Sequence, residues 1–168
     1  IVAISGVSGA DAAESGSQSV TITITENESA PTVTLSTSAT SIAENAGSSL
    51  TLTATLSVAT TADVTVGIST SGTGTEGTDY STISDITISA GATTGTVSFT
   101  PTDDSIYEGN ETGIVAISGV SGADAAESGS QSVTITITEN ESAPTVTLTS
   151  SASSIAENAG SSLTLTAT

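Results

Sequence analysis

Four carboxylates crowd into nine consecutive positions of one stretch, TPTDDSIYEGNE at residues 100–111. They belong to Asp103, Asp104, Glu108 and Glu111. The chain offers them no basic side chain, because its 168 residues include 18 acids but no Lys, Arg or His, for a formal charge of −18. Like charges this close disfavour one another's ionised form, so binding of a cation is the first chemistry that the stretch suggests.

The composition excludes several classes of function. Nucleic-acid binding rests on Lys and Arg that neutralise phosphates, and docking on anionic lipid needs basic clusters, so we expect neither. Without Cys, His or Lys the chain has no disulfide, no thiolate or imidazole metal ligand and little scope for nucleophilic or general-base catalysis. We therefore predict no enzyme activity and no catalytic residues. No run approaches the roughly 18–20 apolar residues of a membrane span, so no membrane insertion is expected.

The chain repeats itself with a period of 113 residues. The segment IVAISGVSGADAAESGSQSVTITITENESAPTVTL begins at Ile1 and again, unchanged, at Ile114, and 52 of the 55 overlapping positions are identical. A period of this length is that of a domain. We predict that these 168 residues are a segment cut from a longer chain, which is a tandem array of such domains. In this prediction residues 1–29 are the C-terminal strands of a preceding repeat, 30–141 form one complete domain, and 142–168 are the N-terminal strands of the following repeat.

Within the complete repeat, apolar residues alternate with Ser and Thr at the period of a half-buried strand. No helical periodicity of useful length occurs. Seven short strands in about 110 residues predict an all-β, immunoglobulin-like seven-stranded antiparallel β-sandwich. The expected strands are residues 32–37, 49–56, 63–69, 86–89, 95–101, 112–118 and 132–138.

This fold makes a prediction about where the acids lie. If successive strands run up and down, the connections after the first, third and fifth strands and the exit from the seventh share one end of the sandwich. Nine of the 13 acids in residues 30–141 fall in those segments, including Glu76. The opposite end keeps Asp63, Asp124 and Glu127, and Asp85 begins the fourth strand.

A dense carboxylate cluster suits a hard divalent cation. Calcium takes six to eight oxygen ligands, whereas magnesium requires a stricter octahedron and retains its water. The alternative is a solvated acidic surface, as in a salt-adapted protein. Such a surface would spread its charge, and it gives no reason to concentrate the charge at one end. We therefore favour Ca²⁺ as the cofactor.

The complete repeat resembles the Calx-β domain, a calcium-binding sandwich found in sodium–calcium exchangers and in very large bacterial surface proteins. The resemblance extends over the whole repeat. It rests on four motifs, which are AEN at 43–45, GTEGTDY at 74–80, DDSIYEGNE at 103–111 and ENE at 139–141.

The resemblance implies a set of metal-binding residues. Its calcium ligands match Glu44, Asp79, Asp103, Asp104 and Glu108, a more peripheral ligand matches Glu111, and the usual Asp-rich triplet matches Glu139, Asn140 and Glu141. Gly109, Asn110 and Asn140 stand where the family often has acids, which lowers the charge and leaves the number of ions open. The repeat counterparts Glu26, Glu28 and Glu157 belong to incomplete domains and are not assigned to a complete site.

Near-identical repeats favour a mechanical role, because binding modules diverge whereas spacers need only length and stiffness. We expect an extender module of a large extracellular, cell-surface bacterial adhesin, with calcium stiffening each junction through ENESAP. The partners would then be neighbouring repeats of the same polypeptide. One alternative is a subunit of an extracellular filament or surface layer, in which copies also touch laterally. Another is a calcium-sensing regulatory domain.

Overall fold

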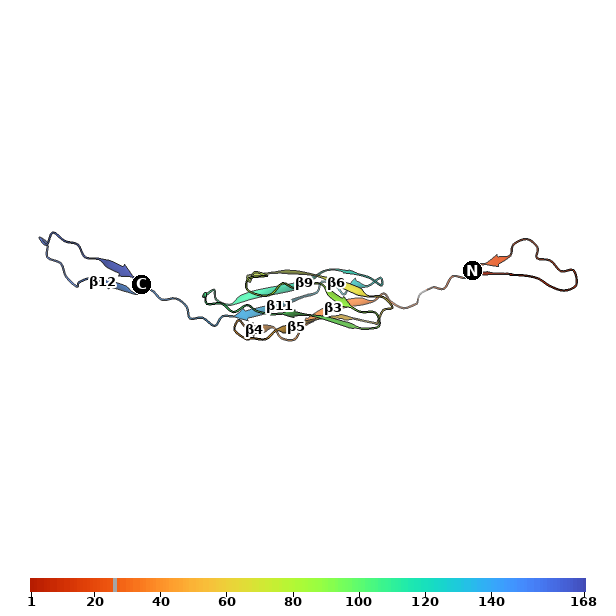
Figure 1. Ribbon diagram of the computed structural model, residues 1–168, viewed down its shortest axis with the longest axis horizontal. Helices are drawn as coiled ribbons and strands as arrows, with labels where there is room; N and C mark the ends of the chain where they lie inside the picture. The colour runs from red at the N-terminus through yellow and green to blue at the C-terminus, as the bar shows by residue number, and fades with distance from the viewer. Residues whose placement is uncertain (26) are drawn as a thin grey trace.

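A computed structural model describes residues 1–25 and 27–168. Glu26, the repeat counterpart of Glu139, lies outside the described residues. A β-sandwich forms the centre of the molecule, and the two terminal segments leave it from opposite ends (Figure 1). The described chain contains no α-helix. It therefore has no helix with the length and apolar character needed to cross a membrane.

Two sheets make up the sandwich. One has the strand order β10-β3-β5-β8 and the other β4-β11-β9-β6-β7. The strands of the first sheet are β3 (Thr32–Thr37), β5 (Leu50–Leu56), β8 (Thr94–Phe99) and β10 (Ala126–Glu127). Those of the second are β4 (Ser41–Ala43), β6 (Val64–Gly72), β7 (Ile86–Ile88), β9 (Glu111–Ser121) and β11 (Ser132–Thr138).

All seven predicted strands are present, and the prediction of an all-β immunoglobulin-like sandwich is confirmed. The described sandwich also contains two short strands that the alternation did not indicate. β4 pairs in parallel with β11, and β10 pairs in parallel with β3, so the sheets are not purely antiparallel. β4 continues the chain from β3 into the opposite sheet, where Ile42 is buried.

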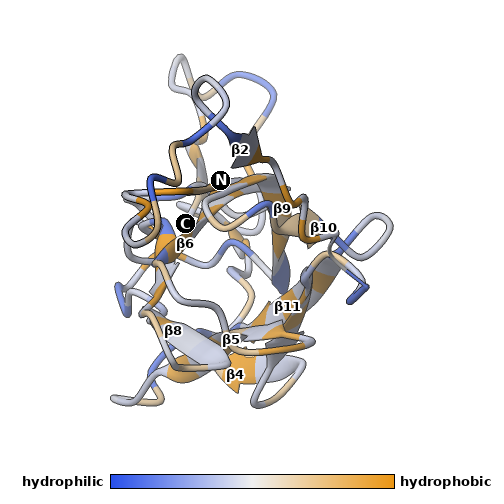
Figure 2. Cartoon of the chain, turned by 90° about the vertical axis from the view of Figure 1, so that its right-hand side faces the viewer, coloured by the Kyte–Doolittle hydropathy of each residue, from blue (hydrophilic) through white to orange (hydrophobic). Residues whose placement is uncertain are grey.

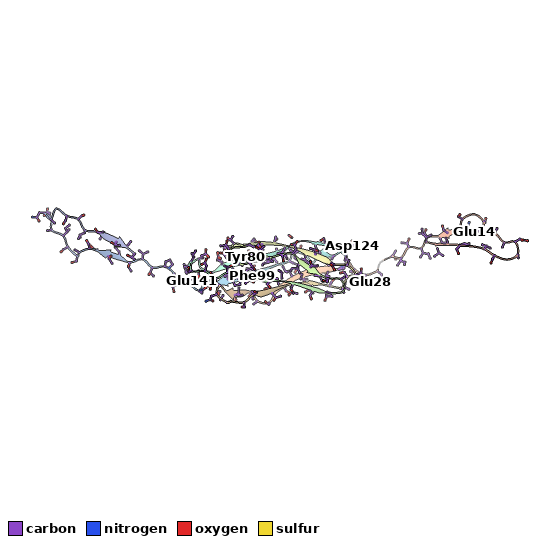
Figure 3. All side chains as sticks on the ribbon, viewed as in Figure 1. Glu14, Glu28, Tyr80, Phe99, Asp124 and Glu141 are labelled. Atoms are coloured by element: carbon purple, nitrogen blue, oxygen red, sulfur yellow. The ribbon has the colours of Figure 1, made fainter. Side chains whose placement is uncertain are left out.

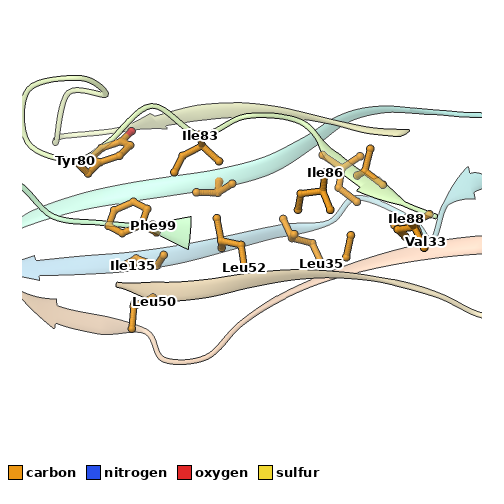
Figure 4. Close-up of a cluster of buried hydrophobic side chains, with 14 of the residues drawn as sticks. Val33, Leu35, Leu50, Leu52, Tyr80, Ile83, Ile86, Ile88, Phe99 and Ile135 are labelled. Atoms are coloured by element: carbon orange, nitrogen blue, oxygen red, sulfur yellow. The ribbon is translucent and has the colours of Figure 1, made fainter. Parts of the chain in front are cut away.

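The inward positions of the strands form one core. Figure 4 shows their side chains meeting in the space between the two sheets. Figure 2 views the molecule along its long axis and shows hydrophobic residues on strands such as β6 and β11, with the hydrophilic residues mainly in the loops. The Tyr80 and Phe99 rings stack with centroids 4.6 Å apart, and both are fully buried. Tyr80 and Ile83 join this core from the connection between β6 and β7.

A β-bulge interrupts the pairing of β6 with β9. The register shifts between Gly67 and Ile68, and the Ile68 N–H donates to Asp85 Oδ1 at 2.9 Å. Asp85 therefore satisfies an amide that the irregular ladder would leave unpaired. Ile68, an apolar residue of the alternating pattern in β6, is only partly buried here.

Each terminal segment forms a small hairpin. β1 (Val2–Ala3) pairs with β2 (Ser19–Val20), and β12 (Leu148–Ser150) pairs with β13 (Leu165–Ala167). Val2 pairs with Val20 just as their counterparts Val115 and Val133 pair in the sandwich. The hairpins thus keep the pairing of the complete domain. The domain boundaries at residues 29/30 and 141/142 stay a prediction.

Candidate metal centre

The predicted ligands come from four segments that meet at one end of the sandwich. Glu44 follows β4, Asp79 lies between β6 and β7, and Glu139 follows β11. The connection from β8 to β9 supplies the acids of the DDSIYEGNE motif, with Glu111 as the first residue of β9. Figure 3 shows Glu141 at this end and Asp124 at the other, as expected from the alternation of strand direction. Glu28 lies at the same end as Asp124.

Glu44, Glu139 and Glu141 form a first carboxylate group. Each offers one oxygen, and these three atoms lie within 4.8 Å of one another. Glu44 is buried, with 8% of its surface exposed, and its Oε1 accepts the Asp104 N–H at 3.3 Å. Burial raises the pKa of Glu44, and the charges of Glu139 and Asp104 raise it further.

Glu139 organises the loops around it through hydrogen bonds. Its Oε2 accepts the N–H groups of Glu108 at 2.7 Å and Gly109 at 2.8 Å, which ties the β8–β9 connection to the end of β11. Its Oε1 accepts the N–H groups of Asn140 and Glu141, each at 3.0 Å. The bonds from the Glu141 and Glu108 amides are the main causes that lower the pKa of Glu139 to about 2. Glu139 is therefore a permanent anion at neutral pH.

Glu141 has the opposite character. Its side-chain contact with Glu139, followed by burial and the Glu139 charge, raises the pKa of Glu141 to about 7. Oε1 accepts the Asn140 side-chain amide at 2.9 Å. Oε2 is buried and has no hydrogen-bond partner, the one such side-chain atom found in the described chain. A buried carboxylate oxygen without a donor is costly, and a bound cation would satisfy it.

Asp79, Glu108 and Glu111 form a second carboxylate group, also with one oxygen each within 4.8 Å. Burial, and then the charges of Asp79 and Glu108, raise the pKa of Glu111 to about 7. The pKa of Glu108 is raised by loss of hydration and by the charges of neighbouring acids, Asp79, Asp104 and Glu139. The Glu139 charge also acts on Glu44, so electrostatics join the second group to the first.

The remaining predicted ligands lie beside these groups rather than within them. Asp104 raises the pKa of Glu44 and Glu108 by its charge, and its own Oδ1 accepts the Ile106 N–H at 2.7 Å. Asp103 raises the pKa of Glu141 by its charge. Asn140 directs its amide nitrogen toward Glu141.

Glu76, an acid at the same end that was not among the predicted ligands, is engaged elsewhere. It accepts bonds from the Thr70 hydroxyl and the Ile83 amide, each at 2.6 Å. It therefore shapes the β6–β7 connection that carries Asp79. The alternation of the strands alone could not separate this structural acid from its neighbours.

The donor set fits calcium. The two groups offer six carboxylates and no nitrogen or sulfur ligand, and calcium prefers six to eight oxygens. Glu141 Oε2 accepts no hydrogen bond, burial raises the pKa of Glu111, and the contact with Glu139 raises the pKa of Glu141. A bound cation would offset each of these costs. The assignment of the nine individual ligands stays a prediction.

Comparison with known proteins agrees with the fold. The sequence profile of the Calx-beta domain matches residues 26–141. A solved structure described as the apo form of the Calx CBD1 domain superposes with a TM-score of 0.53 at 15% identity, covering 67% of this chain and 99% of that one. CBD12 from CALX1.2 gives a TM-score of 0.50 at 17% identity, covering 60% of this chain and 40% of that one. A search of curated protein sequences gave no match.

Proposed function

The chain belongs to the Calx-beta domain family, and from this premise we propose that it is a calcium-stabilised extender module of a large, repetitive extracellular adhesin. In this function, each sandwich acts as a rigid spacer. Calcium bound at one end of the sandwich stiffens the junction with the next repeat. The distal adhesive part of the protein would be projected by many such units.

The environment of Glu141 Oε2 is the main support for calcium binding. This buried oxygen accepts no hydrogen bond, and the Glu141 side chain lies in a group with the carboxylates of Glu44 and Glu139. No basic side chain in the sequence can reach it, because the sequence has none. A cation bound there supplies the missing positive charge, and the oxygens of this group and of the Asp79–Glu108–Glu111 group would hold it.

The position of the site supports a role at the junction. Glu141 is separated from Pro144 by only Ser142 and Ala143, so a cation held by Glu141 also restrains the chain as it leaves the domain. The chain enters and leaves the sandwich at opposite ends (Figure 1). Successive repeats would therefore follow one another end to end. Calcium affinities that suit millimolar extracellular calcium are known for extracellular modules.

Thermal unfolding of the 168-residue chain in excess calcium and in excess chelator tests the calcium part of this proposal. A ligand that binds the folded state alone stabilises it by mass action, so calcium should raise the unfolding midpoint. Magnesium at the same concentration is the matched control and should raise the midpoint less. Equal midpoints in calcium and in chelator would contradict the proposal.

A further inference from the structure

Residues 30–141, all of which the structure describes, expose three large apolar side chains. They are Val58, with 51% of its surface exposed, Ile106, with 61%, and Tyr107, with 44%. The other exposed large apolar side chains of the described chain belong to the terminal segments. The three residues divide between the two ends of the sandwich, and this division suggests that they are complementary.

Val58 lies at the end where the chain enters the domain. It lines an open depression of ≈ 420 Å³ whose walls also include Ala30, Pro31, Ala59 and Ala123. Glu28 lines the same depression and marks this end of the sandwich in Figure 3. The linker from the preceding repeat therefore forms one wall of a hollow in which apolar residues lie between two acids, Glu28 and Asp124.

Ile106 and Tyr107 lie at the other end, in the connection from β8 to β9. Hydrogen bonds fix both sides of this pair, since the Ile106 N–H donates to Asp104 and the Glu108 N–H donates to Glu139. The pair is thus presented on a loop that is tied directly to the start of the linker. No part of the domain covers the side chains of Ile106 and Tyr107.

The linker brings these two ends together in a tandem array. Glu139, which anchors the loop, is four residues before Ala143, the repeat counterpart of Ala30 in the wall of the depression. Four residues span at most about 14 Å. The anchored loop of one repeat is therefore held within a short distance of the depression on the next repeat.

We propose that Ile106 and Tyr107 of one repeat dock into the depression at Val58 of the following repeat. This inference rests on the proposed function, because it requires that the repeats follow one another. Tyrosine suits the contact, since its ring can be buried while its hydroxyl stays in water. So few side chains would bind only weakly between separate chains, but the short linker makes the contact intramolecular.

Fluorescence of a single tryptophan tests this contact, because the chain contains no Trp. Tyr107→Trp is introduced into two chains. The shorter is the 168-residue chain, and the longer is the same chain with a second copy of residues 56–168 joined after Thr168, so that only its first repeat carries the Trp. The added residues complete a second domain, since residues 114–168 repeat residues 1–55. In excess calcium, we expect acrylamide to quench the longer chain less, by roughly twofold or more, because the ring is buried there.

Two further variants complete the test. Val58→Asp in the second repeat should restore the quenching of the shorter chain, because it puts a charge into the depression that receives the ring. Val58 is exposed, so its replacement leaves the core intact. Thr87→Trp, with Tyr107 retained, places the reporter on the exposed side of β7, where quenching should be the same in both chains.

The outcomes separate docking from the calcium-dependent function. Equal quenching of the Tyr107→Trp variant in the two chains would overturn the docking proposal, even if calcium raises the unfolding midpoint. Protection of this reporter in the longer chain, without any calcium effect on the midpoint, would instead leave docking standing and contradict the calcium-dependent function.

Discussion

Glu139 and Glu141 are two residues apart, yet the structure gives them opposite tendencies to ionise. The pKa of Glu139 falls to about 2 because backbone amides of Glu141 and Glu108 donate to it, while that of Glu141 rises to about 7 because Glu139 lies beside it. Each carboxylate therefore has a separate task. Glu139 ties the β8–β9 connection to the end of β11, and Glu141 keeps one oxygen that accepts no hydrogen bond.

Replacing Glu141 by Gln should weaken calcium binding by at least about tenfold while the domain stays folded. The substitution keeps the shape of the side chain and removes a negative charge that has no counterion. Calorimetric titration with calcium measures the effect. Asp124→Asn is the matched control, since it removes a charge at the opposite end, and it should leave the affinity unchanged. An equal loss in both variants would contradict the location of the site.

The site also predicts a pH dependence that calcium reverses. Glu111 and Glu141 have folded-state pKa values of about 7, above the ordinary value of 4.5. The folded state therefore binds more protons than the unfolded state between these values, and stability falls as pH rises through that window. In chelator, the unfolding midpoint should be higher at pH 5 than at pH 7.5.

Calcium needs the same carboxylates deprotonated, so in excess calcium the midpoint should instead be lower at pH 5 than at pH 7.5. Scanning calorimetry in the two buffers checks both signs. The same slope in chelator and in calcium would show that Glu111 and Glu141 do not compete with the ion. Below about pH 4.5 stability should fall in both buffers. Glu139 has a pKa of about 2 in the folded state and an ordinary value of 4.5, so the unfolded state takes up its proton first as the pH falls.

The sequence allowed the location of the acidic cluster to be predicted, but not its internal order. Alternation of strand direction was sufficient to bring Glu44, Asp79 and Glu139 to one end. Whether an acid binds a loop amide, as Glu76 and Glu139 do, depends on the path of each loop, and no periodic pattern encodes that path. The separation of Asp103 from the carboxylate groups has the same origin.

At the scale of strands, alternation predicted the long elements and missed those that depend on tertiary contacts. β4 and β10 have only three and two residues, too few to show a period, and their parallel partners lie far away in the sequence. Tyr80 and Ile83 were missed as core residues because they lie in a connection. Their burial depends on tertiary packing, which for Tyr80 includes the stacked ring of Phe99, and not on local pattern.

β9 provides a matched pair of glycines for testing this packing. A Cβ at Gly113 would lie 2.7 Å from Phe99 Cε2 and 2.9 Å from Cζ, whereas a Cβ at Gly119 would meet nothing within 4 Å. Gly113→Ala should therefore lower the free energy of unfolding by about 1–3 kcal/mol, the usual cost of overpacking a core. Gly119→Ala should change it by less than about 0.5 kcal/mol.

Denaturant unfolding in excess calcium measures both glycine variants. Because the Phe99 ring stacks on Tyr80, which follows Asp79 in the chain, Gly113→Ala should also weaken calcium binding. Equal stability of the two variants would show that the Phe99 ring can move aside without cost. The aromatic pair would then not be what supports the Asp79 loop.

For the whole molecule, the terminal segments show how far the burial of apolar residues depends on two facing sheets. Leu148 is 71% exposed, whereas its counterpart Leu35 is only 7% exposed in the sandwich. The hairpins have the pairing of the domain but lack the opposing sheet that would bury their apolar residues. Burial of apolar area is the main favourable term in folding, so a strand pair from one repeat gains little stability by itself.

Calcium should lengthen an array of repeats without changing the fold of each one. In chelator, the ends of successive domains carry negative charge, and ENESAP is a short polar linker that can bend. A cation held by Glu141 restrains the chain just before Ser142, Ala143 and Pro144, and this leaves the junction less freedom of direction.

Small-angle X-ray scattering of a chain with four joined repeats measures the effect. The maximum dimension should rise in calcium toward that of a straight rod, and chelator should restore a shorter, broader distribution. Glu141→Gln in every repeat is the matched control, since it keeps the rest of the linker sequence and should remove the lengthening. If the maximum dimension is the same in both buffers while circular dichroism shows each domain folded, calcium stabilises the sandwich without controlling the reach of the array, and the extender mechanism fails.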